Sequence, residues 1–92
     1  MAKIFTAAGN VVFSSRPNQM AAVAAQGNAN DFTWQVEFSL DSGTTWSVYK
    51  DSSGVSLFTG ADAKEIRAVS KTNRVKLVNI GTATTVYLEG AG

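Results

Sequence analysis

The clearest pattern in the chain is a strict alternation of apolar and polar residues across positions 32–40. The apolar positions are Phe32, Trp34, Val36, Phe38 and Leu40. A period of two places successive side chains on opposite faces of a β-strand. The stretch therefore predicts a long strand through the middle of the core, with the intervening polar residues facing solvent.

Shorter apolar runs, separated by turn residues, fill the remainder of the chain. We expect further strands over residues 11–13, 44–49, 55–58, 66–69, 74–80 and 85–89. The last two are expected to form a hairpin, and the polar connection 59–65 is compatible with a helical turn. Seven or eight short strands at regular spacing are typical of an all-β fold. The pattern predicts a small antiparallel β-sandwich or jelly roll.

Residues 19–26 contain an alanine-rich run that suits either a short helix or a strand. Alanine favours helix. A helix here would have two turns, no charged face and no clear cap. Small side chains would instead let a strand pack closely under the aromatic strand that follows, and we predict a strand.

The first residues carry the apolar pair Ile4 and Phe5 after Lys3. This segment is compatible with an edge strand or with an N-terminal arm, over residues 1–10, that docks on a neighbour. We predict a single domain over residues 1–92. Because the fold needs few apolar residues at this end, Lys3, Ile4 and Phe5 are the predicted partner contacts.

The amino-acid composition limits the ways in which so small a domain can be stabilised. The chain has no cysteine and no histidine, so disulfides and ordinary zinc, copper or haem sites are excluded. We expect no metal and no cofactor. Small domains often need an additional constraint, and self-association is the one that remains. We therefore expect a homo-oligomer.

The charge pattern argues against two classes of partner. Eight basic and seven acidic residues give a net charge of +1, without a run of like charges, whereas a nucleic-acid binder normally has a basic stripe. No stretch approaches the roughly 20 apolar residues of a membrane span. The first ten residues lack the apolar stretch of a signal peptide. We expect no nucleic-acid or membrane partner, and synthesis in a cytoplasm.

One motif stands out, the Asp-box pattern Ser-x-Asp-x-Gly-x-Thr-Trp. Its residues here are Ser39, Asp41, Gly43, Thr45 and Trp46. The aspartate can accept hydrogen bonds from N–H groups of its own turn. The glycine permits a positive φ, and the tryptophan anchors the returning strand. We therefore predict a structural turn between two strands and no catalytic role.

Catalysis is not expected elsewhere either. Histidine and cysteine are absent, nothing pairs the carboxylates, and no phosphate-binding glycine loop is present. Asp51 and Asp62 are compatible with calcium, although a solvated turn is the favoured interpretation. Tyr49 and Tyr87 are candidates for stacking a sugar ring, whereas Trp34 is expected in the core.

The segment from Val36 to Trp46 resembles a strand and Asp-box turn found in small virion proteins of tailed bacteriophages. Two later segments, 74–81 and 86–90, resemble the closing strands of those proteins. Ser42 departs from the pattern, since a second glycine is common there. The resemblance covers about the last two-thirds of the chain.

The resemblance implies a β-sandwich or jelly-roll protein on the virion, assembled in the host cytoplasm. The implied role is a head decoration (cement) protein, which binds the assembled major capsid protein and stabilises the shell without chemistry. Such proteins are often trimers, so a trimer is the expected homo-oligomer. The alternatives are a carbohydrate-binding module, with a glycan as partner, and a tail or adaptor subunit of the particle.

Overall fold

The chain forms nine β-strands and no helix over residues 2–91, which are the residues that the computed structural model describes. No helix long enough to span a membrane therefore occurs in this range. The strands in chain order are β1 (Lys3–Phe5), β2 (Gly9–Ser14), β3 (Met20–Gly27), β4 (Thr33–Ser39), β5 (Ser47–Val48), β6 (Phe58–Thr59), β7 (Asp62–Arg67), β8 (Thr72–Asn79) and β9 (Val86–Ala91).

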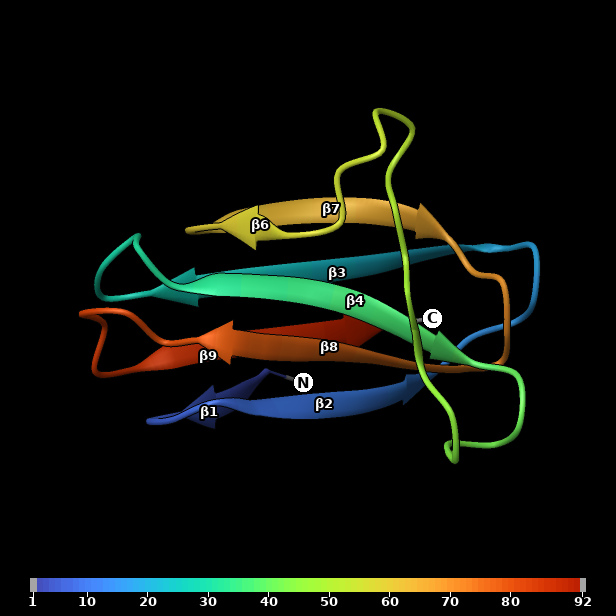
Figure 1. Ribbon diagram of the computed structural model, residues 1–92, viewed down its shortest axis with the longest axis horizontal. Helices are drawn as coiled ribbons and strands as arrows, with labels where there is room; N and C mark the ends of the chain where they lie inside the picture. Colours follow the sequence, from blue (N-terminus) through green and yellow to red (C-terminus); the bar gives the residue numbers. More distant parts are fainter. Residues whose placement is uncertain (1, 92) are drawn as a thin grey trace.

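The strands make two antiparallel sheets that pack face to face (Figure 1). The first sheet, called sheet A, has the order β1-β9-β3-β7. The second, sheet B, has the order β2-β8-β4-β5, and β6 also pairs with β4. The predicted all-β fold is confirmed, and its form is a β-sandwich.

The alanine-rich run is a strand, as predicted. β3 pairs with both β7 and β9 in the middle of sheet A. Ala21, Val23 and Ala25 face inward and are buried, while Ala22 and Gln26 face outward. β3 is paired on both sides over residues 22–25, and these backbone hydrogen bonds outweigh the intrinsic helix preference of alanine.

The first half of the alternating stretch lies in the core, as predicted. Phe32, Trp34 and Val36 are almost completely buried, but Phe38 is half-buried and Leu40 is 77% exposed. Leu40 leaves the sheet because β4 ends at Ser39, where the Asp-box turn begins. The remaining core residues are Phe13, Ala21, Val23, Ala25, Phe58, Ile66, Val75, Leu77, Ala83, Val86 and Leu88.

The predicted hairpin between the last two long strands is wrong. β8 pairs with β2 and β4 in sheet B, whereas β9 pairs with β1 and β3 in sheet A. The connection 80–85 thus crosses from one sheet to the other. Side chains from a distant loop hold it, because the Thr82 N–H donates to Asp31 at 2.8 Å and the Thr84 N–H to Asn28 at 2.9 Å.

Two further expectations differ around β6 and β7. Residues 62–65 belong to β7 and not to a helical turn, and Ala68 and Val69 lie beyond the end of that strand. Val55 and Leu57 are exposed, and only Phe58 and Thr59 form the short strand β6. These boundaries depend on pairing, since β7 begins where β3 offers partners for it.

The first residues take the edge-strand alternative. β1 pairs with β9, and Ile4 lies opposite Tyr87. Phe5 packs against the core, and its ring lies so close to Gly9 that a Cβ atom there would come within 2.5 Å of it. Lys3 and Ile4 are exposed, Ile4 by 58% of its surface.

Candidate functional site

The Asp-box turn is closed by its own polar side chains. Asp41 Oδ1 accepts hydrogen bonds from the Ser39 hydroxyl at 2.7 Å and from the Thr45 N–H at 2.8 Å. The Gly43 N–H donates to Ser39 Oγ at 2.8 Å, and the Trp46 indole N–H donates to the Gly43 carbonyl at 3.0 Å. The structure thus brings all five predicted residues together in one network, which fixes the hairpin between β4 and β5.

The turn requires positive φ at two successive residues. Ser42 has φ of +63° and Gly43 has φ of +103°. A left-handed conformation is favourable for glycine and costly for other residues. The glycine that resembling proteins often carry at the position of Ser42 therefore has a physical reason, and serine keeps the same turn at some conformational cost.

The network makes the turn sensitive to acid. Hydrogen bonds from the Thr45 N–H, then from the Ser39 and Thr45 hydroxyls, lower the pKa of Asp41 from 3.8 to about 2. A carboxyl with a lowered pKa stabilises the fold fully above its ordinary value and loses that contribution as the pH falls toward the lowered value. We expect the Thr45 amide resonance to titrate with a midpoint near 2, and to lose this transition in Asp41→Asn. A midpoint near 3.8 would contradict the hydrogen bonds.

A second aspartate locks the loop after β5. Asp51 Oδ1 accepts hydrogen bonds from the N–H groups of Ser53 at 2.9 Å and Val55 at 2.8 Å. Gly54, with φ of +80°, completes this turn by donating to the Asp51 carbonyl. The sequence contains the signal for this lock, an aspartate followed by a glycine three residues later.

Other carboxylates are also engaged in local bonds. The Ala63 N–H donates to Asp62, whose carboxylate also lies 3.3 Å from Lys64, and these contacts lower the pKa of Asp62. The Thr82 N–H and hydroxyl lower the pKa of Asp31 in the same way. Within residues 2–91 no three acidic side chains gather closely enough to hold a metal ion.

The outer face of sheet B carries an ion pair covered by the Asp-box hairpin. Arg74 Nε donates to Glu37 Oε1, and Gln35 Nε2 donates to Glu37 Oε2 at 2.7 Å. The Arg74 guanidinium lies 4.2 Å from the centre of the Trp46 ring. Glu37 is 5% exposed, so the expectation that it faces solvent is wrong. The hairpin places the Trp46 ring over Arg74. The ion pair is thereby shielded from solvent, although it lies on the outer face of the sheet.

A buried polar network lies near the same hairpin, and the sequence pattern does not predict it. Asn73 donates to Ser15 Oγ at 2.7 Å and to the Ser70 carbonyl at 3.0 Å, and the Ser70 hydroxyl donates to the Ser39 carbonyl. The network ties the ends of β2 and β4 to the turn between β7 and β8. Serine and asparagine are ordinary turn residues, so the sequence gives no signal of this burial.

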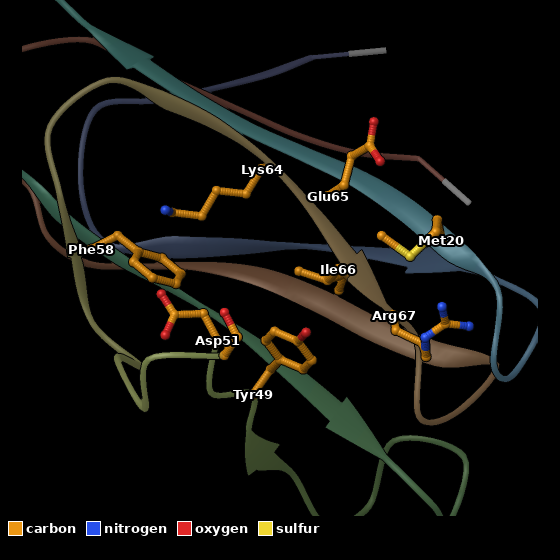
Figure 2. A pocket seen from close by; sticks show the side chains of 9 residues that line it. Met20, Tyr49, Asp51, Phe58, Lys64, Glu65, Ile66 and Arg67 are labelled. Carbon is orange, nitrogen blue, oxygen red and sulfur yellow. The ribbon is translucent and has the colours of Figure 1, made fainter.

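A pocket of about 390 Å³ opens between β7 and the segment 49–58. Figure 2 shows the rings of Tyr49 and Phe58 and the side chain of Ile66 in its interior. The Lys64 ammonium lies 4.5 Å from the centre of the Phe58 ring, on the β7 side. Asp51 adds a carboxylate from the opposite side of the pocket (Figure 2).

The predicted aromatic candidates do not meet in one place. Tyr49 lines the pocket just described, whereas Tyr87 lies on the outer face of sheet A. Trp34 is fully buried, as expected, and the face of Trp46 is occupied by Arg74. A sugar ring stacked on a shared platform of Tyr49 and Tyr87 is therefore incompatible with the structure.

The outer face of sheet A has a floor of alanines. Ala24 on β3 lies opposite Ala63 on β7, and Ala22 lies opposite Glu65. Glu89 of β9 lies on the other side of Ala24. Ile4 and Tyr87 form a cross-strand pair on the same face. The short side chains leave two shallow hollows of about 410 and 350 Å³. Apolar side chains at outward positions of a sheet are typical of a surface that meets another molecule.

Comparisons with protein-family models, with curated proteins and with solved structures gave no match to this chain. The functional assignment therefore rests on the residues of the chain itself.

Proposed function

We propose that this protein is a non-enzymatic structural subunit of a phage virion, of the capsid decoration type. It binds the assembled major capsid protein, associates with further copies of itself and reinforces the shell. The observation that carries this proposal is the alanine-floored outer face of sheet A. The resemblance of the Asp-box segment and the closing strands to tailed-phage virion proteins adds the class of partner.

The state of the carboxylates supports a role without chemistry. Asp31, Asp41 and Asp62 accept local hydrogen bonds that lower their pKa, so they are ionised at neutral pH and cannot act as general acids there. Asp51 locks a turn and Glu37 pairs with Arg74. Polar side chains that an enzyme would direct at a substrate here hold loops and strands together.

The sheet A face suits docking on a preformed protein surface. Alanine side chains bring the partner close to the backbone, lose little conformational freedom on burial and bury apolar area worth about 25 cal/mol per Å². Tyr87, 41% exposed, adds an aromatic ring with a hydroxyl at the side of this floor. A broad, shallow face of this kind fits another protein better than a small molecule.

Co-sedimentation with purified phage heads tests the proposal. We expect the wild-type chain to pellet with heads whose own copies have been stripped. Ala22→Arg places a long charged side chain on the exposed floor and should abolish pelleting. Val48→Arg makes the same change at an exposed position of sheet B and should pellet like the wild type.

Three outcomes would decide against this assignment. Failure of the wild-type chain to pellet with heads would refute the decoration role. Pelleting with purified tails instead would support the tail or adaptor alternative. Equal binding by Ala22→Arg and the wild type would exclude the sheet A face as the docking surface.

A further inference from the structure

The two long sides of the sandwich differ in how their edge strands are protected. On one side, β7 carries four charged residues, and the segment 49–57 runs in front of it (Figure 1). Charges on an edge strand discourage pairing with another chain. The opposite side, formed by β1 and β2, has Lys3 as its one charged residue.

β2 has the properties of an unprotected edge. Its six residues, Gly9–Ser14, include no charge and no proline. Within residues 2–91 it pairs with β8 alone, so the backbone groups on its other side have no strand partner. Val12 is 59% exposed on the outer face. Unpaired N–H and C=O groups in a valine-rich strand are a template for β-sheet extension.

We propose that β2 pairs antiparallel with β2 of a second copy of this chain, across a two-fold axis, and joins the two B sheets into one. This inference deepens the self-association in the proposed function and rests on that part of it alone. A two-fold contact uses the same surface on both copies, so the pair closes and does not grow into a fibre.

Two copies of β2 can pair without placing incompatible side chains opposite each other. Side chains opposite each other in a sheet must share a face, which limits the central registers to those about Val11 or Val12. The register about Val12 sets Val12 against Val12, Asn10 against Ser14 and Val11 against Phe13. No charge enters, and β-branched and aromatic pairs stabilise antiparallel strands.

The same comparison of registers disfavours self-pairing of β7. The central registers of β7 with its own copy set Lys64 against Lys64 or Glu65 against Glu65, and like charges directly opposite are destabilising. On the outer face, Val12 and Asn10 of β2 lie opposite Arg74 and Lys76 of β8. Across the pair, the two β8 strands would lie about 14 Å apart, from a strand spacing of about 4.8 Å. That distance exceeds the Debye length of about 8 Å.

Light scattering of the purified full chain tests the pairing. We expect the wild type to have twice the mass of one chain, and Val12→Lys to have half the wild-type mass, because two lysines would then meet at the axis. Val69→Lys changes another exposed valine, just beyond β7, and should keep the wild-type mass.

Amide hydrogen exchange adds a local readout. Amides of β2 that point away from β8 should exchange slowly in the wild type and in Val69→Lys but fast in Val12→Lys, while amides of β4 stay protected in all. The circular dichroism of each variant should match the wild type, since Val12 and Val69 are exposed.

The mass also decides between this contact and other arrangements. A wild-type mass of one chain, or of three chains as the resemblance implies, would overturn the β2 pair, as would a Val12→Lys protein that keeps the wild-type mass. Head binding is measured separately. Loss of head binding with the pair intact contradicts the decoration role alone, and head binding by an unpaired wild type contradicts this inference alone.

Discussion

Trp34→Ala is expected to cost about 3–5 kcal/mol of folding free energy and to leave the chain close to unfolded. Trp34 is fully buried, packs against Phe58 with ring centroids 5.0 Å apart, and donates its indole N–H to the Gly60 carbonyl at 3.0 Å. Truncation removes the ring, opens a cavity between the sheets and leaves a buried carbonyl without its donor. Small domains have a total stability of only about 5–15 kcal/mol.

Urea unfolding followed by circular dichroism measures this loss, and Trp46→Ala is the matched control. Trp46 has the same ring but lies half-buried on the outer face, where its removal exposes Arg74 and opens no core cavity. We expect it to cost less than half as much as Trp34→Ala. Equal losses for the two variants would contradict the central position of Trp34.

Arg74→Met is expected to cost about 3 kcal/mol, because it leaves the Glu37 carboxylate buried without its counter-charge. The side chains of Glu37 and Arg74 are 7% and 19% exposed, and Gln35 is the remaining hydrogen-bond partner of the carboxylate. The variant also loses the contact between the guanidinium and the Trp46 ring. The same unfolding experiment measures the change.

The double variant Glu37→Gln, Arg74→Met separates the charge from the packing. Removing both charges abolishes the penalty of an unpaired buried ion, so stability should return to within about 1 kcal/mol of the wild type. A double variant as unstable as Arg74→Met would show that packing of Arg74 under Trp46 dominates. It would then contradict the importance that we assign to the buried charge.

The sequence correctly predicts those parts of the protein whose structure is determined by interactions between residues close together along the chain. The alternation at Phe32, Trp34 and Val36 requires a strand with one buried face. The Asp-box residues close their turn with bonds that span at most four positions. In both cases the interacting groups are neighbours along the chain, so spacing alone carries the information.

The sequence-based predictions are wrong where contacts with a distant segment determine burial or strand pairing. The pattern around Glu37 looks like a solvent-facing position until Arg74 and Trp46 are brought over it. The short connection 80–85 resembles a hairpin turn, yet Asn28 and Asp31 hold it as a crossover between sheets. Both strands that it joins are paired on two sides, and this pairing outweighs a local hairpin.

The chain by itself therefore determined an all-β fold, a central aromatic strand and a locked Asp-box turn. Only the tertiary structure decided which strands share a sheet, which strands remain as edges, and which outward face is floored by alanines. Side-chain alternation fixes two faces for each strand but does not say what covers them. What covers each face depends on contacts between residues far apart in sequence. In this protein those contacts make the Asp-box a structural turn and leave the outer face of sheet A and the edge of β2 exposed for the proposed contacts.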